Sequence, residues 1–363
     1  MILAALRRRA VGATLGASKI GNYSRRAFSE MTALGASGSL LLRCQDSVGI
    51  VAEVASSMVT QSANIRNIDV HIEKGVFVCR CCFEHHSWGT FDRGVLESGI
   101  DALTQRFDAS ASLIMGNGRR VDFGAHTGMG TIDPSWEGIR IGPGVPGDAP
   151  KHPAMRVVRD EGKARVGVFM SKTEHCLLDL LNRSRGGDLP IKVAYVVSNH
   201  KASEHLEALL AQAEIPYHYV PHTGRPREEW DADLRDIVSG ETTDFLVLAR
   251  YMQIVSGDFL QWYKAPVVNI HHGLLPSFKG ANPYRQAHAA GVKLIGATAH
   301  FVTEELDEGP IIEQRVERVG HKETLADLTR KGEVLEASAL SEAVKKLAEN
   351  RIARIGSRTV VFA

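Results

Sequence analysis

The sequence predicts an α/β protein built from two unlike units, a small N-terminal βαββαβ unit and a larger, doubly wound sheet that is mainly parallel. The first observation behind this is the order of hydrophobic periodicities. It runs β, α, β, β, α, β over residues 39–115 and then alternates strand with helix over residues 165–363. The second is the Gly- and Pro-rich stretch 116–164, which lacks sustained periodicity and which we interpret as a linker.

Residues 1–29, ahead of both units, have the composition of an organelle transit peptide. They contain six Lys and Arg, no Asp or Glu, and several serines and small residues. The sequence Arg26-Ala27-Phe28-Ser29 resembles a mitochondrial processing site, so we expect a mature chain that starts near Ser29 and is located in the mitochondrion. A plastid destination and a plain disordered basic tail are the alternatives.

The small unit is predicted from strand and helix patterns that follow one another closely. Asp46 is expected to cap the first helix, in which Val51 and Val54 have helical spacing. The cysteines at 79–82 fall in a strand, and no second cysteine pair completes a tetrahedral zinc site. The expected elements are strand 39–44, a helix that begins after Asp46, strands 65–72 and 76–83 joined by the turn 73–75, helix 91–107 and strand 109–115.

The larger unit is predicted to begin with a strand, a turn and a helix over residues 165–182. Ser171 or Thr173 is expected to cap this helix, and the turn has no glycine-rich phosphate cradle. The G-x-G-x-x-G at 142–147 contains two prolines where a dinucleotide fingerprint needs a helix start, so it predicts no nucleotide site. The remaining expected elements are strands 192–197, 245–249, 267–270, 295–302 and 310–315, and helices 202–213, 283–290 and 325–350.

Composition excludes several classes of protein. The chain of 363 residues is 44% hydrophobic and 23% charged, as in ordinary soluble domains, and its net charge of +1 argues against a dedicated nucleic-acid surface. No apolar run approaches the roughly 20 residues needed to span a bilayer. Five unevenly spaced cysteines favour a reducing compartment over a disulfide framework.

The candidate chemistry lies at residues 266–314. Strand alternation places Asn269 and His271 on one face and His272 on the other, and Asp307 lies in a loop after the next apolar run. An amide donor, an imidazole and a carboxylate suit acyl chemistry through a tetrahedral oxyanion. Taken separately, they also fit a strand end, a packed core histidine and an Asx turn. His300 is either a second histidine of the site or a packed strand residue.

The same stretch resembles a known family. Asn269-Ile270-His271, Leu274–Phe278, Gly280 and Leu306–Pro310 together resemble the transformylases that use formyltetrahydrofolate. Residues 248–255 are similar to the segment of those enzymes whose backbone receives the pterin ring.

Several departures favour one branch of that family. The histidine is doubled as His271-His272, and the phosphate cradle is missing at 170–176. A separate departure, Gly273 in place of a serine often found next, does not bear on the branch and leaves the role of that position open. The small unit, with Asp46-x-x-Gly49-Ile50-Val51, resembles an ACT domain. Together with Gly296–His300 and the tail 350–361, these features resemble the formyltetrahydrofolate deformylase family.

This resemblance implies a formyltransferase-fold domain that hydrolyses 10-formyltetrahydrofolate to formate and tetrahydrofolate, with no cofactor and no metal. The alternative is a formyltransferase that acts on an amine such as glycinamide ribonucleotide, and a third reading is an inactive amino-acid-sensing protein. We also expect a homo-oligomer, a small amino-acid effector, and no nucleic-acid or membrane partner. The implied residues are Asn269, His271 and Asp307 for catalysis, Met252, Gln253, Ile254, Val255, Thr303 and Glu304 for folate, and Asp46, Gly49 and Ile50 for the effector.

Overall fold

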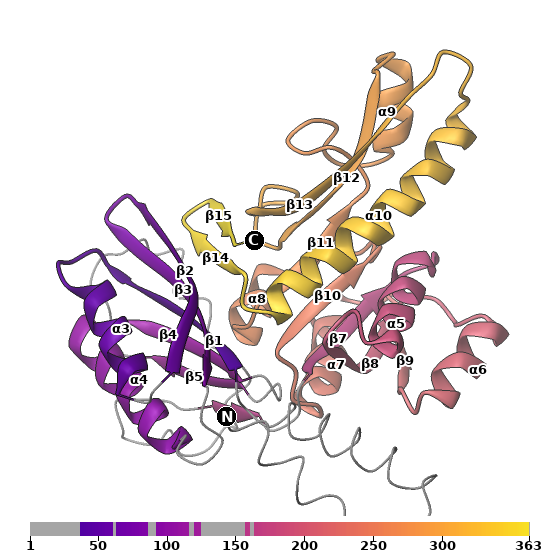
Figure 1. Cartoon of the computed structure of the whole chain (residues 1–363). Helices are drawn as coiled ribbons and strands as arrows, with labels where there is room; N and C mark the ends of the chain where they lie inside the picture. The colour runs from indigo at the N-terminus through magenta and orange to yellow at the C-terminus, as the bar shows by residue number, and fades with distance from the viewer. Residues whose placement is uncertain are drawn as a thin grey trace, which may run out of the picture.

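A computed structural model describes residues 37–60, 63–85, 92–115, 120–124, 157–159 and 163–362. In these residues the chain forms a small unit and a larger unit, which lie side by side with a C-terminal hairpin between them (Figure 1). The expected transit peptide at 1–29 and the G-x-G-x-x-G at 142–147 lie outside the described residues. No described helix is both long enough and apolar enough to cross a membrane.

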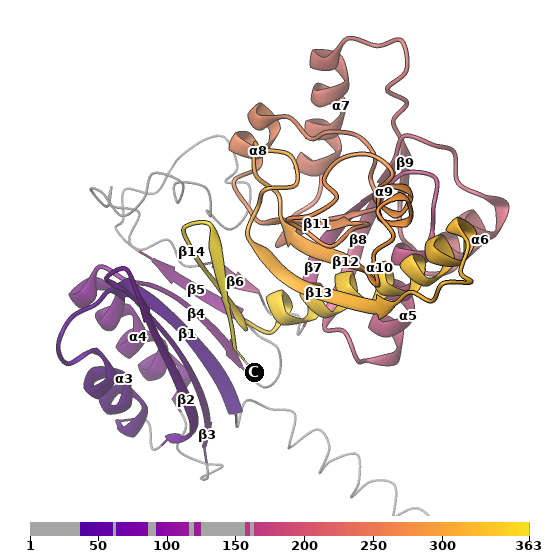
Figure 2. The same cartoon turned by 90° about the horizontal axis from the view of Figure 1, so that it is seen from above.

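The small unit is a sheet with two helices on one face (Figure 2). The strand order β2-β3-β1-β4-β5-β6 contains the predicted βαββαβ arrangement, with antiparallel pairing throughout. The helices bury Val54 and Ile100 against the sheet. The elements are β1 (Ser37–Gln45), α3 (Ile50–Val59), β2 (Ala63–Glu73), β3 (Val76–His85), α4 (Arg93–Phe107), β4 (Ser110–Met115), β5 (Arg120–Gly124) and β6 (Val157–Arg159).

The linker predicted over 116–164 is partly wrong, because β5 and β6 extend the small sheet. β5 pairs with β4, and β6 pairs with β5. Val121 and Phe123 are buried in the core of the small unit. Their two-residue spacing is a strand pattern, but it is too short to stand out beside the neighbouring glycines.

Two predicted helix caps are also wrong. Asp46 does not cap α3, because residues 48–49 form a turn and the helix starts after Gly49, whose φ of 97° is left-handed. Neither Ser171 nor Thr173 caps α5 (His175–Gly186), whose N-cap is Glu174 without a side-chain bond. Ser171 instead bonds to residues far away in sequence, as described below.

The larger unit is a seven-stranded sheet in the order β13-β12-β11-β10-β7-β8-β9. The five strands from β11 to β9 are parallel, as predicted, and β12 and β13 are antiparallel additions. The chain starts in the middle of the sheet, at β7, and adds strands on both sides. The strands are β7 (Ala164–Met170), β8 (Ile191–Ser198), β9 (Tyr217–Tyr219), β10 (Phe245–Ala249), β11 (Val267–His271), β12 (Leu294–Phe301) and β13 (Ile311–Arg318).

Helices cover both faces of this sheet because its central strands are apolar on both sides. Val168 packs with α5 and α10 on one face, and Phe169 packs with α7 and α8 on the other. Such double burial is what the near-continuous apolar runs in these strands predict. The remaining helices are α6 (Glu204–Gln212), α7 (Arg227–Ser239), α8 (Gly257–Tyr263), α9 (Pro283–Ala289) and α10 (Leu325–Ala348).

The two units share a junction made by the C-terminus. After α10, Asn350 is buried and its amide donates to the carbonyl and hydroxyl of Ser112 on β4, at 3.3 and 2.8 Å. The hairpin β14 (Ile352–Ile355) and β15 (Arg358–Val361) then lies on the open face of the small sheet (Figure 2). The apolar residues of this contact are Val76, Val78, Ala353, Ile355 and Phe362, with Leu41 and Val360 beside them.

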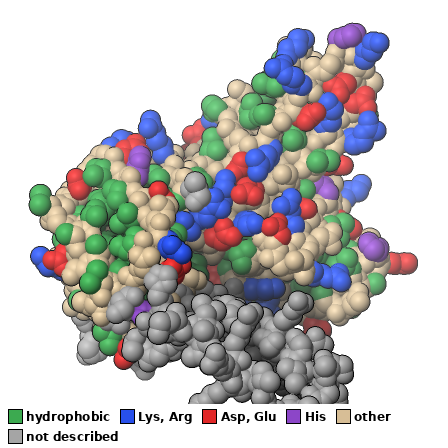
Figure 3. Space-filling view, in the orientation of Figure 1, with side chains coloured by type: hydrophobic (Ala, Val, Ile, Leu, Met, Phe, Trp, Pro, Cys, Tyr) green, Lys and Arg blue, Asp and Glu red, His purple; other side chains and the backbone are tan. Residues whose placement is uncertain are grey.

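The outer surfaces of the two units differ. Charged side chains of both signs mix along the outer face of the larger unit, whereas apolar side chains gather over the small unit (Figure 3). We call the latter the apolar surface of the small unit. Among the described residues, the exposed large apolar side chains of the small unit are Val48, Val51, Val59, Val70, Ile72 and Val95.

Candidate active site

The candidate site forms where β11 and β12 run beside each other. In this antiparallel pair Asn269 lies opposite His300, and His271 lies opposite Thr298. The predicted alternation along β11 therefore holds, since Asn269 and His271 both reach the same cluster of polar side chains. Asn269, His271 and His300 are therefore positioned by strands rather than by surface loops.

Asp307 comes to this cluster from the loop between β12 and β13. Its Oδ2 lies 3.3 Å from His271 Nδ1 and accepts from the backbone N–H of Gly280 at 3.2 Å, and its Oδ1 lies 3.9 Å from His300 Nε2. Burial alone would raise the pKa of this carboxyl. The hydrogen bond and charge of His271, with the Gly280 N–H and His300, outweigh it and hold the pKa below its usual range. Asp307 is therefore a carboxylate in the site.

His300 is fixed in one tautomer by its neighbours. Its Nδ1 lies 2.9 Å from the carbonyl of Phe301, which can only accept, so Nδ1 carries the proton. Burial lowers the pKa of His300, so the ring is neutral and Nε2 accepts from the Asn269 amide at 3.3 Å. This arrangement points the Asn269 NH₂ into the site. It also assigns His300 to the site rather than to the core alone.

The loop after the histidine pair is held by two residues that sequence reasoning missed. Thr298 donates to the carbonyl of Gly273 at 2.8 Å and accepts from the N–H of Leu275 at 3.0 Å. Gln314 donates to the Leu275 carbonyl at 2.8 Å. Further along, the carbonyl of Phe278 lies 3.0 Å from His271 Nε2. Thr298 and Gln314 thus position His271 through this loop.

The glycine after the histidine pair has a structural explanation. A Cβ at Gly273 would lie 2.9 Å from His271 Nε2 and 2.9 Å from Pro283 Cβ, closer than carbon side chains normally approach. A larger residue there would displace His271. The absence of a side chain at Gly273 therefore leaves room for the imidazole.

The segment expected to receive the pterin ring follows β10. Met252 and Ile254 are exposed, whereas Val255 packs into the core and contributes only backbone to any ligand surface. The N–H of Met252 donates to Ser171 Oγ at 2.9 Å, and the guanidinium of Arg227 donates to the Ile254 carbonyl at 2.6 Å. The backbone of the segment is therefore held from two sides.

The loop with Thr303 and Glu304 lies beside the same segment. Glu304 accepts from Gln261 of α8 at 2.9 Å, and a Cβ at Gly257 would be 3.3 Å from its carboxyl carbon. Thr303 Oγ1 donates to the Glu305 carbonyl at 3.1 Å. Gln253 is partly exposed in the segment after β10. The two stretches assigned to folate from the sequence thus adjoin each other through α8.

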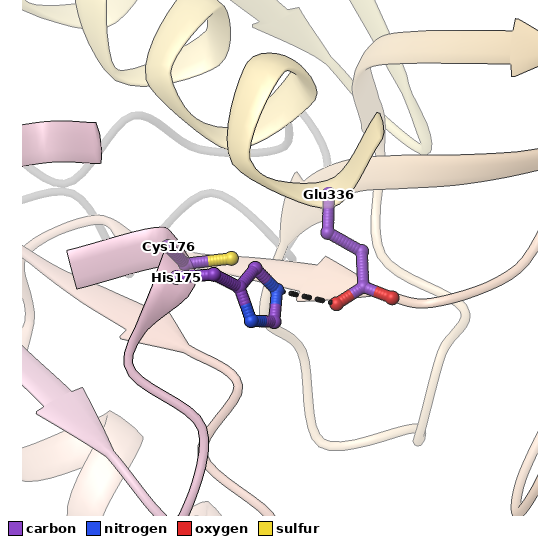
Figure 4. A group of neighbouring side chains, drawn as sticks. All are labelled: His175, Cys176 and Glu336. Carbon is purple, nitrogen blue, oxygen red and sulfur yellow. Dashed lines mark hydrogen bonds and ion pairs between the residues drawn. The ribbon is translucent and has the colours of Figure 1, made fainter. Parts of the chain in front are cut away.

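A second polar cluster, centred on the buried Glu336 of α10, lies next to the site. Its Oε2 is 2.9 Å from His175 Nε2 at the start of α5 (Figure 4), and its Oε1 accepts from Tyr284 at 2.7 Å. Arg250 Nε lies 3.1 Å from Oε2, as an ion pair rather than an aligned hydrogen bond. Burial would raise the pKa of Glu336, but these three partners together hold it below its usual range. Sequence reasoning missed this cluster because its members are far apart in the chain.

His175, Cys176 and Glu336 are close enough to invite comparison with a metal centre, with possible ligand atoms within 4.8 Å of one another (Figure 4). The chemistry of the group does not fit a cation well. Glu336 is already compensated by the guanidinium of Arg250. Burial raises the pKa of the Cys176 thiol well above its ordinary value, which disfavours the thiolate that binds metal. We therefore interpret the cluster as an internal ion-pair network.

Comparisons with known proteins decide the family. The formyl transferase family profile matches residues 164–344. Formyltetrahydrofolate deformylase 2, mitochondrial, from Arabidopsis thaliana is 38% identical over 332 residues, which cover 90% of this chain and 87% of that protein. The chain belongs to the formyltetrahydrofolate deformylase family. The fold predicted from the sequence is confirmed for both the small unit and the formyltransferase-fold unit.

Solved structures separate the deformylase family from its transferase relatives. A formyltetrahydrofolate deformylase from Pseudomonas syringae superposes with a TM-score of 0.72 at 30% identity, covering 94% of this chain and 99% of that one. Glycinamide ribonucleotide transformylase 1 from Symbiobacterium toebii has a TM-score of 0.52 at 34% identity and covers only 55% of this chain. The deformylase thus matches both units of the fold, and the transformylase is not the better match.

Proposed function

We propose that the protein hydrolyses 10-formyltetrahydrofolate to formate and tetrahydrofolate. The observation that carries this proposal is the Asn269–His271–Asp307–His300 cluster in a chain that matches deformylases over about nine-tenths of its length. The amine-transfer alternative has less support, because the transformylase structure covers 55% of the chain.

In the proposed reaction, water adds to the formyl carbon and a tetrahedral oxyanion forms. The Asn269 NH₂, oriented by His300, donates to that oxygen. His271 Nε2 exchanges its bond to the Phe278 carbonyl for one to the substrate, while Asp307 stabilises the cationic ring from Nδ1. The C–N bond then breaks, the folate nitrogen takes the proton that the water gives up, and formate leaves. No covalent enzyme intermediate and no cofactor take part in this scheme.

The test is to incubate the protein with 10-formyltetrahydrofolate and no acceptor, and to measure formate and tetrahydrofolate. We expect both products in equal amounts, and loss of both in Asn269→Ala and His271→Ala variants by about 100-fold or more. Absence of formate combined with transfer to added glycinamide ribonucleotide would overturn the proposal. Unchanged formate release in both variants would overturn the site assignment.

The small unit is proposed to be an ACT-like regulatory module that binds a small amino acid. The supporting feature is the turn from Asp46 to Ile50, where Gly49 has a left-handed φ and Ile50 starts α3 with its backbone N–H groups facing out of the helix end. Calorimetry with glycine and with methionine tests this. Heat that disappears in a Gly49→Val variant supports it, and no heat with either ligand favours a module without effector.

Two further proposals concern the whole protein. We expect a homo-oligomer, in which the apolar surface of the small unit pairs with a second copy, and sedimentation measurements test this. We also propose a mitochondrial location, supported by the composition of residues 1–29 and by the mitochondrial Arabidopsis relative. Removal of residues 1–29 from a fluorescent fusion should abolish import.

A further inference from the structure

The order of strands in the larger sheet marks a particular crevice. The chain enters at β7, adds β8 and β9 on one side, and then adds β10 and β11 on the other. The connection after β7 therefore runs to one side of the sheet, and the connection after β10, the neighbouring strand, runs to the other side. In open α/β sheets of this kind, ligands bind beyond the carboxyl ends of the strands at this switch point. Here that position lies between Ser171 and Arg250, the first residues after the two strands.

In this protein, side chains of the chain itself fill the switch-point crevice. Ser171 Oγ accepts from the N–H of Met252 and donates to Asn199 Oδ1 at 2.7 Å, which ties the two strand exits together. Arg250 and His175 both contact the same oxygen of Glu336. Three separate elements thus converge on one carboxylate that is 1% exposed.

The network is built into the backbone as well. A Cβ at Gly332 would lie 2.1 Å from the ring of Tyr284, so this ring lies directly on the backbone of α10. From there its hydroxyl reaches Glu336, one turn further along the helix. Tyr284 also meets the ring of His272 edge-on at 5.9 Å, and His272 adjoins His271 at 5.4 Å. The network therefore borders the catalytic histidine.

We propose that the His175–Arg250–Tyr284–Glu336 network determines acceptor specificity, by filling the place where an amine acceptor would otherwise bind and leaving room at the formyl carbon only for water or a nucleophile of similar size. This rests on the proposed deformylase function. Burying a carboxylate with its three partners costs desolvation free energy. A role in excluding the wrong acceptor explains why a helix would retain this arrangement. In the transfer that the network prevents, the amine nitrogen would bond to the formyl carbon, the bond to the folate nitrogen would break, and the amine proton would go to that nitrogen.

The first test uses the unmodified protein with 10-formyltetrahydrofolate and a saturating amine. With glycinamide, formate should account for all tetrahydrofolate formed, and mass spectrometry should detect no N-formylglycinamide. With hydroxylamine, which is close to water in size, formyl hydroxamate should appear. Equal transfer to both amines would overturn the proposal. Absence of formate in the control without amine would instead overturn the proposed function.

The second test removes the network. His175→Ala and Glu336→Ala should yield N-formylglycinamide at least about tenfold above the unmodified protein, because a discrimination of this kind is worth a factor of about 10 to 200. Val334→Ala, at an exposed position on the same helix, is the matched control and should yield formate only. His175 is 21% exposed at a helix start, so its variant should fold even where Glu336→Ala does not. A folded His175→Ala protein that hydrolyses normally and forms no N-formylglycinamide would overturn the proposal.

Discussion

Asp307 adopts a backbone conformation that most residues avoid. Its φ of 57° is in the left-handed region, which aspartate and asparagine tolerate better than other residues. Two residues later, a Cβ at Gly309 would lie 1.7 Å from the carbonyl oxygen of Phe301, so only glycine fits there. The carboxylate is therefore aimed at His271 by a loop whose conformation is set by two special positions.

Replacement of Asp307 by Asn should separate charge from shape. Asn fills the same space and tolerates the same φ, but it cannot stabilise a cationic His271. We expect formate release to fall by about 100-fold or more, with the unfolding temperature shifted by only a few degrees. Steady-state kinetics and circular dichroism check this. A variant with full activity would contradict the role given to the carboxylate.

His272 should make stability depend on pH. Burial, with the charge of Arg250, lowers its pKa to about 4, whereas an unfolded histidine titrates near 6.5. Glu336 and Asp307 oppose this shift and His271 adds to it. Between these values the unfolded state binds the extra proton, so stability falls as pH falls below 6.5. At pH 7 both states are neutral and the histidine contributes nothing.

We expect the titration of His272 to lower the free energy of unfolding by about 2 kcal/mol between pH 7 and pH 5. Urea unfolding at the two pH values, in the unmodified protein and in His272→Gln, isolates it, since the other groups titrate in both. On acidification, the free energy of unfolding of the variant should fall by about 2 kcal/mol less than that of the unmodified protein. An identical pH dependence in the two proteins would show that His272 titrates normally in the folded state.

At the scale of elements, β12 and the loop after β11 act as one unit. Thr298 is fully buried, and its hydroxyl makes bonds to both Gly273 and Leu275. Because this loop ends in the Phe278 carbonyl that contacts His271, the Thr298 hydroxyl positions the imidazole indirectly, through the loop. A displacement of about 1 Å in such a group can reduce turnover by about 100-fold.

Thr298→Val therefore should lower kcat by about 10- to 100-fold with little change in KM, because the segments proposed to bind folate after β10 and β12 are untouched. Thr298→Ser keeps the hydroxyl and is the matched control, for which we expect near-normal kcat. Loss of activity to the same extent in both variants would contradict the role given to the hydroxyl, because Thr298→Ser retains it.

Which elements the sequence could predict follows from how local their signals are. The buried strands β7, β10 and β11 have continuous apolar runs, and the alternation in β11 correctly grouped Asn269 with His271. The hairpin β14–β15 and the partners of Glu336 were not predicted. Their stability comes from residues 52 or more positions away, to which no local periodicity points.

At the scale of the molecule, the two units are joined by a shared core as well as by the chain. Ile355, from the hairpin, packs against Val76 and Val78 of β3, and Arg358 forms an ion pair with Glu73 at 3.2 Å. Asn350 adds buried hydrogen bonds to Ser112. The boundary between the units in space therefore differs from their boundary in the sequence.

Ile355→Ala should test this shared core. Truncation of a buried isoleucine removes about 2–5 kcal/mol of stability, and here the loss should be felt by the small unit as well as by the hairpin. Val361→Ala, on the same hairpin but 38% exposed, should change stability by about 0.5 kcal/mol or less. Faster hydrogen exchange in β3 of the Ile355 variant, but not of the Val361 variant, would confirm the coupling. An increase in exchange that is confined to residues 352–362 would contradict it.

The hairpin that covers one face of the small sheet also has a consequence for folding during synthesis on the ribosome. Its strands β14 and β15 follow the elements of both units in the chain, whereas the face they cover is complete once β3 and β4 exist. At roughly 5–20 residues per second, the larger unit takes about 10–50 s to synthesise. For that time Val76 and Val78 are without the hairpin residues that bury them, so the nascent small unit exposes these two side chains until the hairpin has been made.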